Sequence, residues 1–295
     1  IDKRMMGDLL ALAGRANLLL IAGGPAIDGE HVESALDAAF RPADASLTLK
    51  ELAPNLTELR SARIFLDPPI ADALNRLEIA QQPVFTYLVN GIRGHDRLTP
   101  YSFVSASGAP LVTDLRDDEI MINNWTARDL GVRIGDNITL DYFILGPMRS
   151  LVEQSRSFRL RRIVPLSGIY ADADLMPDFP GLAGQENCRD WDAGFPIDYD
   201  KIRDRDEEYW DDFRGTPKAF VTLKAAQEMW GNRFGDLTAV RFAAPADSLQ
   251  RALTPLLEPR NLGLLVQPVR QQGEAAGEQS ISFSQLFLGL SFFLI

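Results

Sequence analysis

The sequence of 295 residues predicts an α+β fold with mixed sheets. Short β-prone runs fill the middle of the chain, and helices with one apolar face lie before and after them without the regular strand–helix alternation of an α/β protein. Hydrophobic residues make up 46% of the chain, enough to bury a sizeable core. We find no internal repeat and no low-complexity tract, so the chain should hold one large domain or two interleaved ones.

The first 80 residues predict one strand and two helices. Residues 18–21 form a short apolar run before Gly23 and Gly24, which is typical of a buried strand. Asp28 is a candidate N-cap for a helix that Pro42 ends. A second helix is predicted over residues 69–77. The apolar faces consist of Val32, Ala35, Leu36, Ala39 and Phe40 in the first helix and of Ile70, Ala73, Leu74 and Leu77 in the second.

The middle of the chain predicts a series of strands. Gly, Pro and Asp separate the β-prone runs. Residues 137–144 and 158–164 alternate apolar with polar side chains, as strands with one buried face do. A stretch poor in regular pattern and rich in Asp, Pro and Gly, residues 171–216, predicts a long surface excursion before the final run. The predicted strands are residues 84–89, 101–104, 119–122, 137–144, 158–164 and 219–223.

The region before the C-terminus predicts a β-α-β unit. Residues 237–242 and 263–269 are the two predicted strands, with Asp247 as the N-cap of the helix between them and Pro255 as the residue that bends or shortens this helix. The buried face of this helix should consist of Leu249, Ala252, Leu253 and Leu256.

The chain ends in an apolar run. No charged residue follows Glu278, and ten large apolar residues in the stretch 279–295 favour a bilayer by about 3 to 6 kcal/mol on insertion scales. We therefore expect residues 279–295 to be a truncated transmembrane helix, with a buried terminal helix as the alternative. The ten residues are Ile281, Phe283, Leu286, Phe287, Leu288, Leu290, Phe292, Phe293, Leu294 and Ile295.

The flanks of this run predict the side of the membrane. After Arg270 there is no further Lys or Arg, whereas cytoplasmic flanks are usually basic, so the rest of the chain should lie outside the cytoplasm. The chain opens at Ile1 without an initiator Met or a signal peptide, and we expect it to be a piece of a longer protein.

These elements predict three parts. Residues 1–112 and 237–278 should form a membrane-proximal α+β subdomain that contains the β-α-β unit. Residues 113–236 should form a β-rich inserted subdomain with the long acidic loop, and residues 279–295 the start of the transmembrane helix.

Charge and cysteine content exclude several classes. The chain has 41 acidic against 30 basic residues and a net charge of −11, which disfavours nucleic acid as a partner because phosphate binding needs clustered Lys and Arg. Cys188 is the only cysteine, so no intrachain disulfide can form.

The inventory of catalytic motifs predicts no catalytic residue, no cofactor site and no metal site. His31 and His95 are the only histidines, and neither belongs to an HExxH or Cys/His pattern. The sequence also lacks GxSxG, GxxxxGK[ST] and GxGxxG patterns. Any ATP chemistry would therefore come from a partner.

The acidic excursion contains the candidate interaction surface. Its aromatic residues Trp191, Tyr199, Tyr209 and Trp210 offer large contact area if they are exposed, and the alternative is that they pack onto the β-rich middle. The surrounding acids could bind calcium, but no window fits an EF-hand, and we favour a solvated loop. These acids are Asp190, Asp192, Asp198, Asp200, Asp204, Asp206, Glu207, Glu208, Asp211 and Asp212.

Residues 119–143 read EIMINNWTARDLGVRIGDNITLDYF. This segment predicts a strand, a short helix capped by Asn123 or Asn124 and ended by Gly131, a turn at Gly135-Asp136 and another strand. It resembles a segment of the extracytoplasmic domains of FtsX-like ABC transporter permeases, of the MacB-like periplasmic core type. The likeness extends loosely through residues 158–165 and 209–221 to the C-terminus, about two thirds of the chain.

The resemblance implies a non-catalytic domain on the periplasmic or extracellular side of the bacterial inner membrane. It implies a cytoplasmic ATP-binding subunit, a second permease subunit in a homo- or heterodimer, and a periplasmic adaptor or lipoprotein cargo as partners. ATP hydrolysis on the partner would move the subunits, and the outer domain would transmit the movement to a lipoprotein, peptide or other envelope substrate.

Two other classes of function remain open at this point. A secreted or membrane-anchored hydrolase would use paired carboxylates of the acidic loop, about 5 to 10 Å apart in a cleft. A solute-binding domain would have a deep ligand pocket between subdomains.

Overall fold

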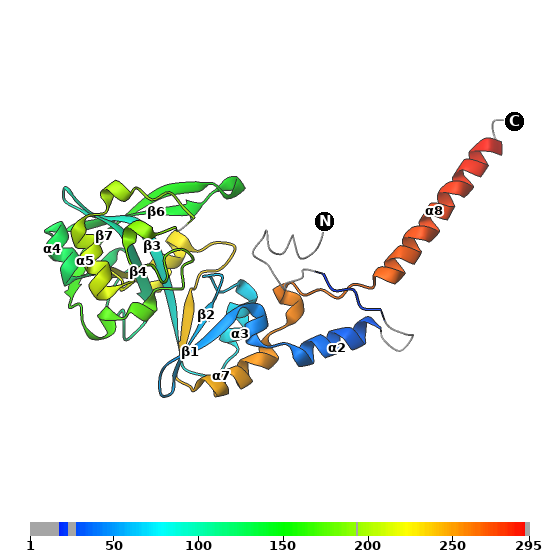
Figure 1. Cartoon of the computed structure of the whole chain (residues 1–295), viewed down its shortest axis with the longest axis horizontal. Helices are drawn as coiled ribbons and strands as arrows, with labels where there is room; N and C mark the ends of the chain where they lie inside the picture. The colour runs from blue at the N-terminus through cyan, green and yellow to red at the C-terminus, as the bar shows by residue number, and fades with distance from the viewer. Residues whose placement is uncertain (1–17, 23–27, 193, 293–295) are drawn as a thin grey trace. The chain divides into compact units, whose positions relative to one another are not determined.

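The computed structural model describes residues 18–22, 28–192 and 194–292. Figure 1 shows an α+β fold, as the sequence predicts. The chain divides into two compact units, Arg41–Leu262 on the one hand and Ile1–Phe40 with Gly263–Ile295 on the other.

A closed barrel is the centre of the larger unit. Among the described residues, six strands follow one another in the order β3-β4-β8-β5-β7-β6, and β6 pairs back onto β3 at Gly91, Ile92 and Arg93. The pairs β4–β8 and β5–β7 are parallel and the others antiparallel. The strands are β3 (Gln81–Gly94), β4 (Arg97–Ser107), β5 (Glu119–Asn123), β6 (Asn137–Leu145), β7 (Leu151–Val164) and β8 (Ala219–Val221).

The sheet continues beyond the barrel from the first residues of β3. There β3 pairs with β9 (Ala239–Phe242), β9 with β2 (Leu56–Ser61), and β2 with β1 (Leu47–Ala53). Helix α7 (Ala246–Leu253) packs against β1 and β2. The strands of both predicted subdomains thus share one sheet of nine strands in the described part of the chain, and the predicted borders at residues 112 and 236 stay a prediction.

The predicted β-α-β unit is wrong in its second strand. Residues 263–268 form no strand, and Leu264 and Leu265 are exposed, because no neighbouring strand pairs with them among the described residues. Asp247 lies in the first turn of α7 and not at its cap, which is Pro245. The helix ends at Leu253, before Pro255, as expected.

Two helices supply core residues to the barrel. Helix α4 (Asn124–Leu130) contributes Ala127 and Leu130, and α6 (Leu223–Trp230), which the sequence did not predict, contributes Trp230. The Trp230 ring stacks on Tyr87 at 5.1 Å between centroids and meets Phe85 and Tyr142 edge-on. The barrel interior is therefore a packed apolar core and not a channel.

The segment 119–143 folds as the sequence predicts. Strand β5 leads into α4, the Asn123 side chain accepts a hydrogen bond from the Thr126 backbone N–H, and Gly131 ends the helix at φ 67°. A left-handed residue at this position favours glycine. Strand β6 then returns along β7.

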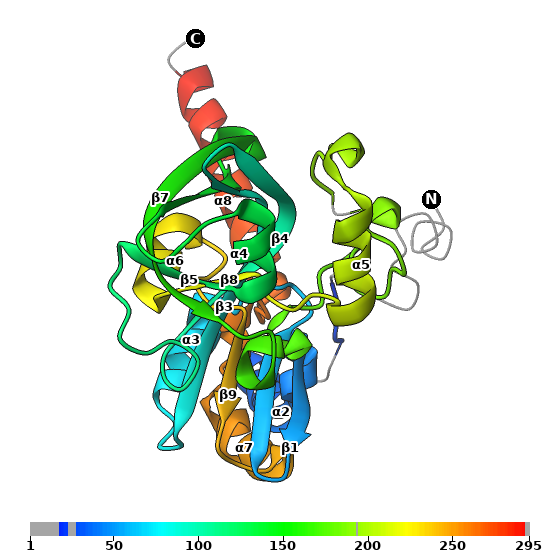
Figure 2. The same ribbon diagram turned by 90° about the vertical axis from the view of Figure 1, so that its left-hand side faces the viewer.

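Residues 165–217 connect β7 to β8 and include the predicted surface excursion at 171–216. From here on the name excursion is used for the whole connection, residues 165–217. The described part of the excursion adds no strand to the sheet but contains α5 (Asp204–Phe213), which the sequence did not predict. Figure 2 shows α5 and its neighbours to one side of the barrel, next to β4. The short 3-10 helices of the excursion are η3 (Gly168–Ala171), η4 (Ala173–Leu175), η5 (Cys188–Asp190) and η6 (Tyr199–Lys201).

The remaining short elements of the larger unit lie in its connections. Helix α3 (Pro68–Asn75) buries Ile70, Ala73 and Leu74, as predicted. The other 3-10 helices are η1 (Pro42–Ala45), η2 (Pro147–Arg149), η7 (Thr254–Leu256) and η8 (Pro259–Leu262).

The smaller unit has two described helices. Helix α2 (Gly29–Ala39) begins at its predicted cap, since the Asp28 carboxylate accepts a hydrogen bond from the His31 backbone N–H. The predicted strand at residues 18–21 is wrong, because these residues are exposed and form no regular structure; Gly23 and Gly24 lie outside the described residues.

Helix α8 (Val269–Phe292) begins ten residues before the predicted helix start at 279, and residues 293–295 lie outside the described part. Its described side chains near the C-terminus are exposed: Phe287 to 69%, Leu288 to 72% and Leu290 to 54%. None of the helices in the described residues combines the length and the apolar character that crossing a membrane requires. The truncated transmembrane helix stays a prediction.

Candidate functional site

The four aromatic residues of the predicted interaction surface lie in the excursion, but three of them are buried. Trp191, Tyr209 and Trp210 are almost fully covered, whereas Tyr199 keeps 42% of its surface exposed. Of the two alternatives, exposure is therefore wrong for these three. Trp191 and Trp210 form a core with residues of β3 and β4, and Tyr209 packs against Trp125 of α4 at 4.8 Å between centroids. A docking role for this surface stays a prediction. The strand residues in this core are Leu88, Tyr101 and Phe103.

The buried rings hold the irregular parts of the excursion together. Trp191 and Trp210 meet edge-on at 4.9 Å between centroids. The indole N–H of Trp210 donates to the Gln185 carbonyl at 3.1 Å, and the Tyr199 hydroxyl donates to the Trp191 carbonyl at 2.5 Å. These contacts let a segment with little regular structure keep one conformation.

Helix α5 presents one polar and two aromatic side chains to the barrel. Its buried residues Asp206, Tyr209 and Trp210 are spaced by three and four positions, so they share one face. At its start the Asp206 carboxylate accepts a hydrogen bond from the Arg203 backbone N–H at 3.1 Å. The acidic first turn favours the helix because negative charge stabilises a helix N-terminus.

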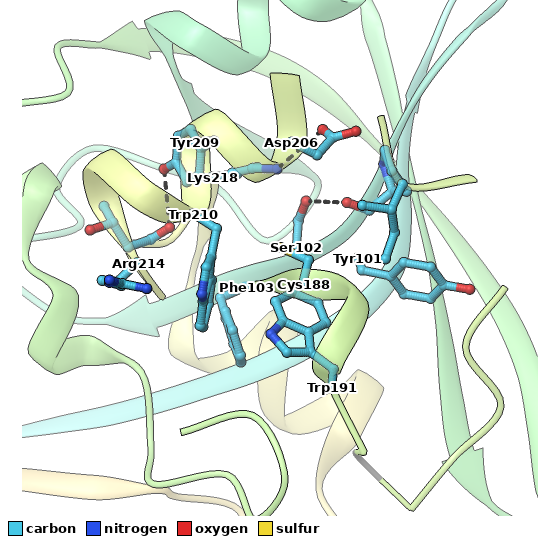
Figure 3. Close-up of a pocket in the computed structure, with 13 residues that line it drawn as sticks. Tyr101, Ser102, Phe103, Cys188, Trp191, Asp206, Tyr209, Trp210, Arg214 and Lys218 are labelled. Atoms are coloured by element: carbon cyan, nitrogen blue, oxygen red, sulfur yellow. Dashed lines mark hydrogen bonds and ion pairs between the residues drawn. The ribbon is translucent and has the colours of Figure 1, made fainter. Parts of the chain in front are cut away.

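Lys218 is the charged group at the contact between barrel and excursion. Its ammonium lies 4.6 Å from the ring centroids of Trp125 and of Tyr209, and 3.8 Å from an Asp206 oxygen. Figure 3 shows Lys218 between Tyr209 and Asp206. The 3.8 Å separation is too long for a direct hydrogen bond. The cation is therefore held by two aromatic faces and one carboxylate.

A second charged contact joins α5 to α4. The buried Asp129 carboxylate accepts hydrogen bonds from Arg203 at 2.7 Å and from the Thr99 hydroxyl at 2.5 Å, and Arg205 lies 2.6 Å from its other oxygen. Arg203 also binds Asp206 at 2.7 Å, so one guanidinium connects two carboxylates.

Asn123 adds a neutral contact at the same place. Its amide N–H donates to the Tyr209 hydroxyl at 3.0 Å, and that hydroxyl donates to the Thr216 carbonyl at 3.1 Å. The same side chain caps α4 through its oxygen. One residue therefore fixes the start of α4 and the position of α5.

The pKa shifts at this site follow from burial. Burial lowers the pKa of Lys218 to about 8, against the attraction of Asp206. Burial raises the pKa of Tyr209 and of the Cys188 thiol. Burial also opposes the charge of Asp129, but hydrogen bonds from Arg203 and Thr99 outweigh it and lower the pKa of Asp129. The aspartate thus stays ionised while Lys218 titrates near neutral pH.

A cavity of about 20 Å³ lies against these residues. It has room for about one water molecule, since a water needs about 10 to 15 Å³ of such space. A typical ligand pocket has a volume of about 300 to 1,000 Å³, so this cavity is far smaller. Its lining includes Tyr101, Ser102, Cys188, Trp191, Trp210 and Lys218 (Figure 3).

A further buried ion network joins the start of the excursion to β2 and β9. The Glu58 side chain has no exposed surface and is bound by Arg60 and by Arg241, the latter at 2.6 Å. Arg241 also lies 2.7 Å from Asp172 of the excursion, and Arg60 donates to the Asp174 carbonyl. Burial opposes the charge of Arg241, but Glu58 and Asp172 outweigh it and raise its pKa.

The acidic residues of the excursion do not gather around a common point. In the described part of the chain, no three His, Cys, Asp or Glu side chains are placed so that they could hold a metal ion. Several of the acids bind arginines instead, among them Asp206 with Arg203 and Asp204 with Arg189.

Sequence reasoning did not find Lys218, Asp129 or Glu58. Some of their partners are far away along the chain, as in the contacts of Arg203 with Asp129 and of Arg241 with Glu58. The one local signal is at Lys218, which directly precedes the apolar run 219–221, where a charge needs a partner. Asn123 was predicted as a helix cap, but its contact with Tyr209 was not.

Comparison with known proteins gives likenesses among solved structures. No family model matches the chain, and no curated protein matches it. Among solved structures, the crystal structure of the periplasmic region of MacB from Actinobacillus actinomycetemcomitans is 9% identical, covers 71% of this chain and 83% of its own, and gives a TM-score of 0.35. A score this low carries no argument about fold or function.

Proposed function

We propose that this chain is a non-catalytic extracytoplasmic domain of an ABC transporter permease subunit. In this account α8 holds the domain at the bacterial inner membrane, on the periplasmic or extracellular side. ATP hydrolysis on a cytoplasmic partner moves it together with a second permease subunit. The barrel transmits that movement to a lipoprotein, a peptide or another envelope substrate.

The observation that supports this proposal most is the apolar surface of α8. Phe287, Leu288 and Leu290 expose more than half of their surface to solvent. Several exposed apolar side chains within one helical turn are costly in water and favourable in lipid or against another apolar helix. The proposal therefore places this end of α8 against a membrane.

The segment 119–143 supports the same proposal. Its resemblance to permease domains rests on a strand, a capped helix, a glycine and a returning strand, and the segment adopts this order in β5, α4 and β6. Its residues pack into the core and link strands, which suits a mechanical element.

The closed barrel supports a mechanical role as well. A ring of paired strands around a packed core resists deformation and moves as one body. The charged side chains at the contact between barrel and excursion bind one another, and the cavity beside them has room for about one water molecule. This arrangement is suited to holding elements together.

Vesicle flotation tests the membrane placement. We expect the chain to float with vesicles of phosphatidylethanolamine and phosphatidylglycerol, and the double variant Leu288→Lys/Leu290→Lys to stay in the soluble fraction. Each replacement costs about 3 kcal/mol on insertion scales, about a hundredfold in partitioning. The double variant Gln271→Lys/Gln272→Lys adds the same charge at exposed positions of α8 and should float like the unchanged chain. Equal flotation of both double variants would refute the placement.

A further inference from the structure

The excursion is built as a separate layer on the outside of the barrel. Its described residues join no strand of the sheet, and its own core consists of side chains such as Leu182, Cys188 and Trp210. It rests on outward-facing side chains of β3 and β4, namely Leu88, Tyr101 and Phe103. Lifting it would leave the barrel strands paired as they are.

Lys218 belongs to the barrel side of this contact. Its backbone N–H donates to the Phe103 carbonyl at 2.9 Å, and its carbonyl accepts from the Asn123 N–H at 3.0 Å. Its ammonium is covered by Tyr209 and Asp206 of α5 and by Trp125 of α4. A movement of α5 away from the barrel would therefore bring the Lys218 ammonium into water.

We propose that the part of the excursion after Leu175 is a lid that opens away from the β3–β4 face as a unit, and that the charge on Lys218 controls how often it opens. The part before it stays on the barrel, since Tyr170 and Leu175 pack with Val84 and Phe220 and Asp172 binds Arg241. Closing the lid takes the ammonium out of water, and the single carboxylate at 3.8 Å replaces that hydration only in part. The charged amine thus favours the open lid, whereas the neutral amine fits the aromatic surroundings. This inference does not depend on the proposed permease function.

Among the titratable groups at this contact, Lys218 is the one whose charge changes near neutral pH. From α5 and its cap these are Asp206, Tyr209 and Arg203, from α4 Asp129, and from η5 Cys188. In the closed lid the pKa of Asp129 is lowered and the pKa values of Tyr209, Cys188 and Arg203 are raised, so these four keep their charge state between about pH 7 and pH 9. Cys188 belongs to the core of the excursion itself, with Leu182 and Trp210, and moves with the lid.

The sign of the pH effect follows from linkage. The pKa of Lys218 is about 8 when the lid is closed and returns towards 10.5 when the lid opens, so the open state binds more protons. A state that binds more protons is favoured at low pH. The open population is therefore largest below the lower pKa, and it falls about tenfold between about pH 7 and pH 9.

Hydrogen exchange on the whole chain tests the lid. The Asp198 N–H donates to the Tyr101 hydroxyl of β4 at 2.6 Å, so opening of the lid breaks this bond. We expect the Asp198 amide to exchange faster than the amides of β4, and its protection, corrected for the intrinsic pH effect, to rise about tenfold from about pH 7 to pH 9. In Lys218→Met, which keeps an apolar stem, this rise should disappear. Lys224→Met removes an exposed charge and should keep it. Exchange of the Asp198 amide as slow as that of β4 at every pH, or the same pH effect in Lys218→Met, would overturn the proposal.

A second measurement needs no variant. Acetic anhydride modifies neutral amines, so Lys218 reacts when the lid is open, while exposed Lys224 reports the intrinsic reactivity. We expect the ratio of Lys218 to Lys224 modification, read by peptide mass spectrometry, to fall about tenfold between about pH 7 and pH 9. A ratio that stays constant or rises contradicts control by Lys218.

Discussion

Replacing Glu58 by alanine should lower the free energy of unfolding by about 3 to 5 kcal/mol, because it removes the buried carboxylate that two guanidinium groups share and leaves them only the more exposed Asp172 and Asp178. The Glu58 side chain has no exposed surface, and the side chains of Arg60 and Arg241 are only 8% and 11% exposed. Glu58 lies opposite Arg241 in the pairing of β2 with β9, so neither arginine can turn to solvent without moving its strand.

Urea unfolding followed by circular dichroism measures this effect. Glu51→Ala is the matched control, since Glu51 is an exposed residue of the neighbouring strand β1, and it should change stability by less than about 0.5 kcal/mol. The Glu58 variant should also loosen the start of the excursion, because Arg241 binds Asp172. A loss below about 1 kcal/mol for Glu58→Ala would show that the network is not the buried ion cluster described here.

The second large effect is expected at Trp230. Truncation to alanine should cost about 3 to 5 kcal/mol, because it empties the largest buried side-chain volume of the barrel core. The ring contacts Phe85, Tyr87 and Tyr142, which belong to β3 and β6. Both strands lose packing at the place where β6 closes the barrel onto β3.

Trp230→Phe separates packing from polarity. The indole N–H of Trp230 has no hydrogen-bond partner among the described residues, and phenylalanine removes this buried donor while it keeps an aromatic ring. We expect a loss of less than about 1.5 kcal/mol for this variant in the same unfolding assay. If both variants lose the same stability, the ring contacts are not what holds the barrel closed.

The sequence predicts the elements whose pattern is local. The strand, cap, helix and glycine of residues 119–131 follow from Asn123, the spacing of Ala127 and Leu130, and Gly131, and all are confirmed. The alternation in residues 137–144 predicts β6 in the same way.

The elements that were missed or wrong depend on distant neighbours. Residues 18–21 and 263–269 are apolar enough for strands, but a strand needs a paired neighbour, and hydropathy does not provide one. Helix α5 was missed because six of its ten residues are acidic, which hides the apolar spacing of Tyr209 and Trp210. Its stability comes from packing and from the bonds of Arg203.

The candidate site shows the same limit. Sequence reasoning selected Trp191, Tyr209 and Trp210 as important residues of the excursion but left open whether they are exposed or packed on the barrel. The burial of Trp191 and Trp210 depends on Leu88, Tyr101 and Phe103, which lie in strands about a hundred residues earlier. Lys218 was missed because its pKa and its role follow from Asp206 and the rings that cover it, and the fold brings these groups together.

The central claim is that this chain moves in response to ATP hydrolysis on another polypeptide. Affinity purification of the protein that carries this chain from its native membranes tests it most directly, with the ATPase activity of the purified sample as the readout. The account predicts a stoichiometric partner that contains a GxxxxGK[ST] phosphate loop and hydrolyses ATP. Recovery of the chain without such a partner, together with a hydrolase activity that a single acidic substitution in the chain abolishes, would contradict the account.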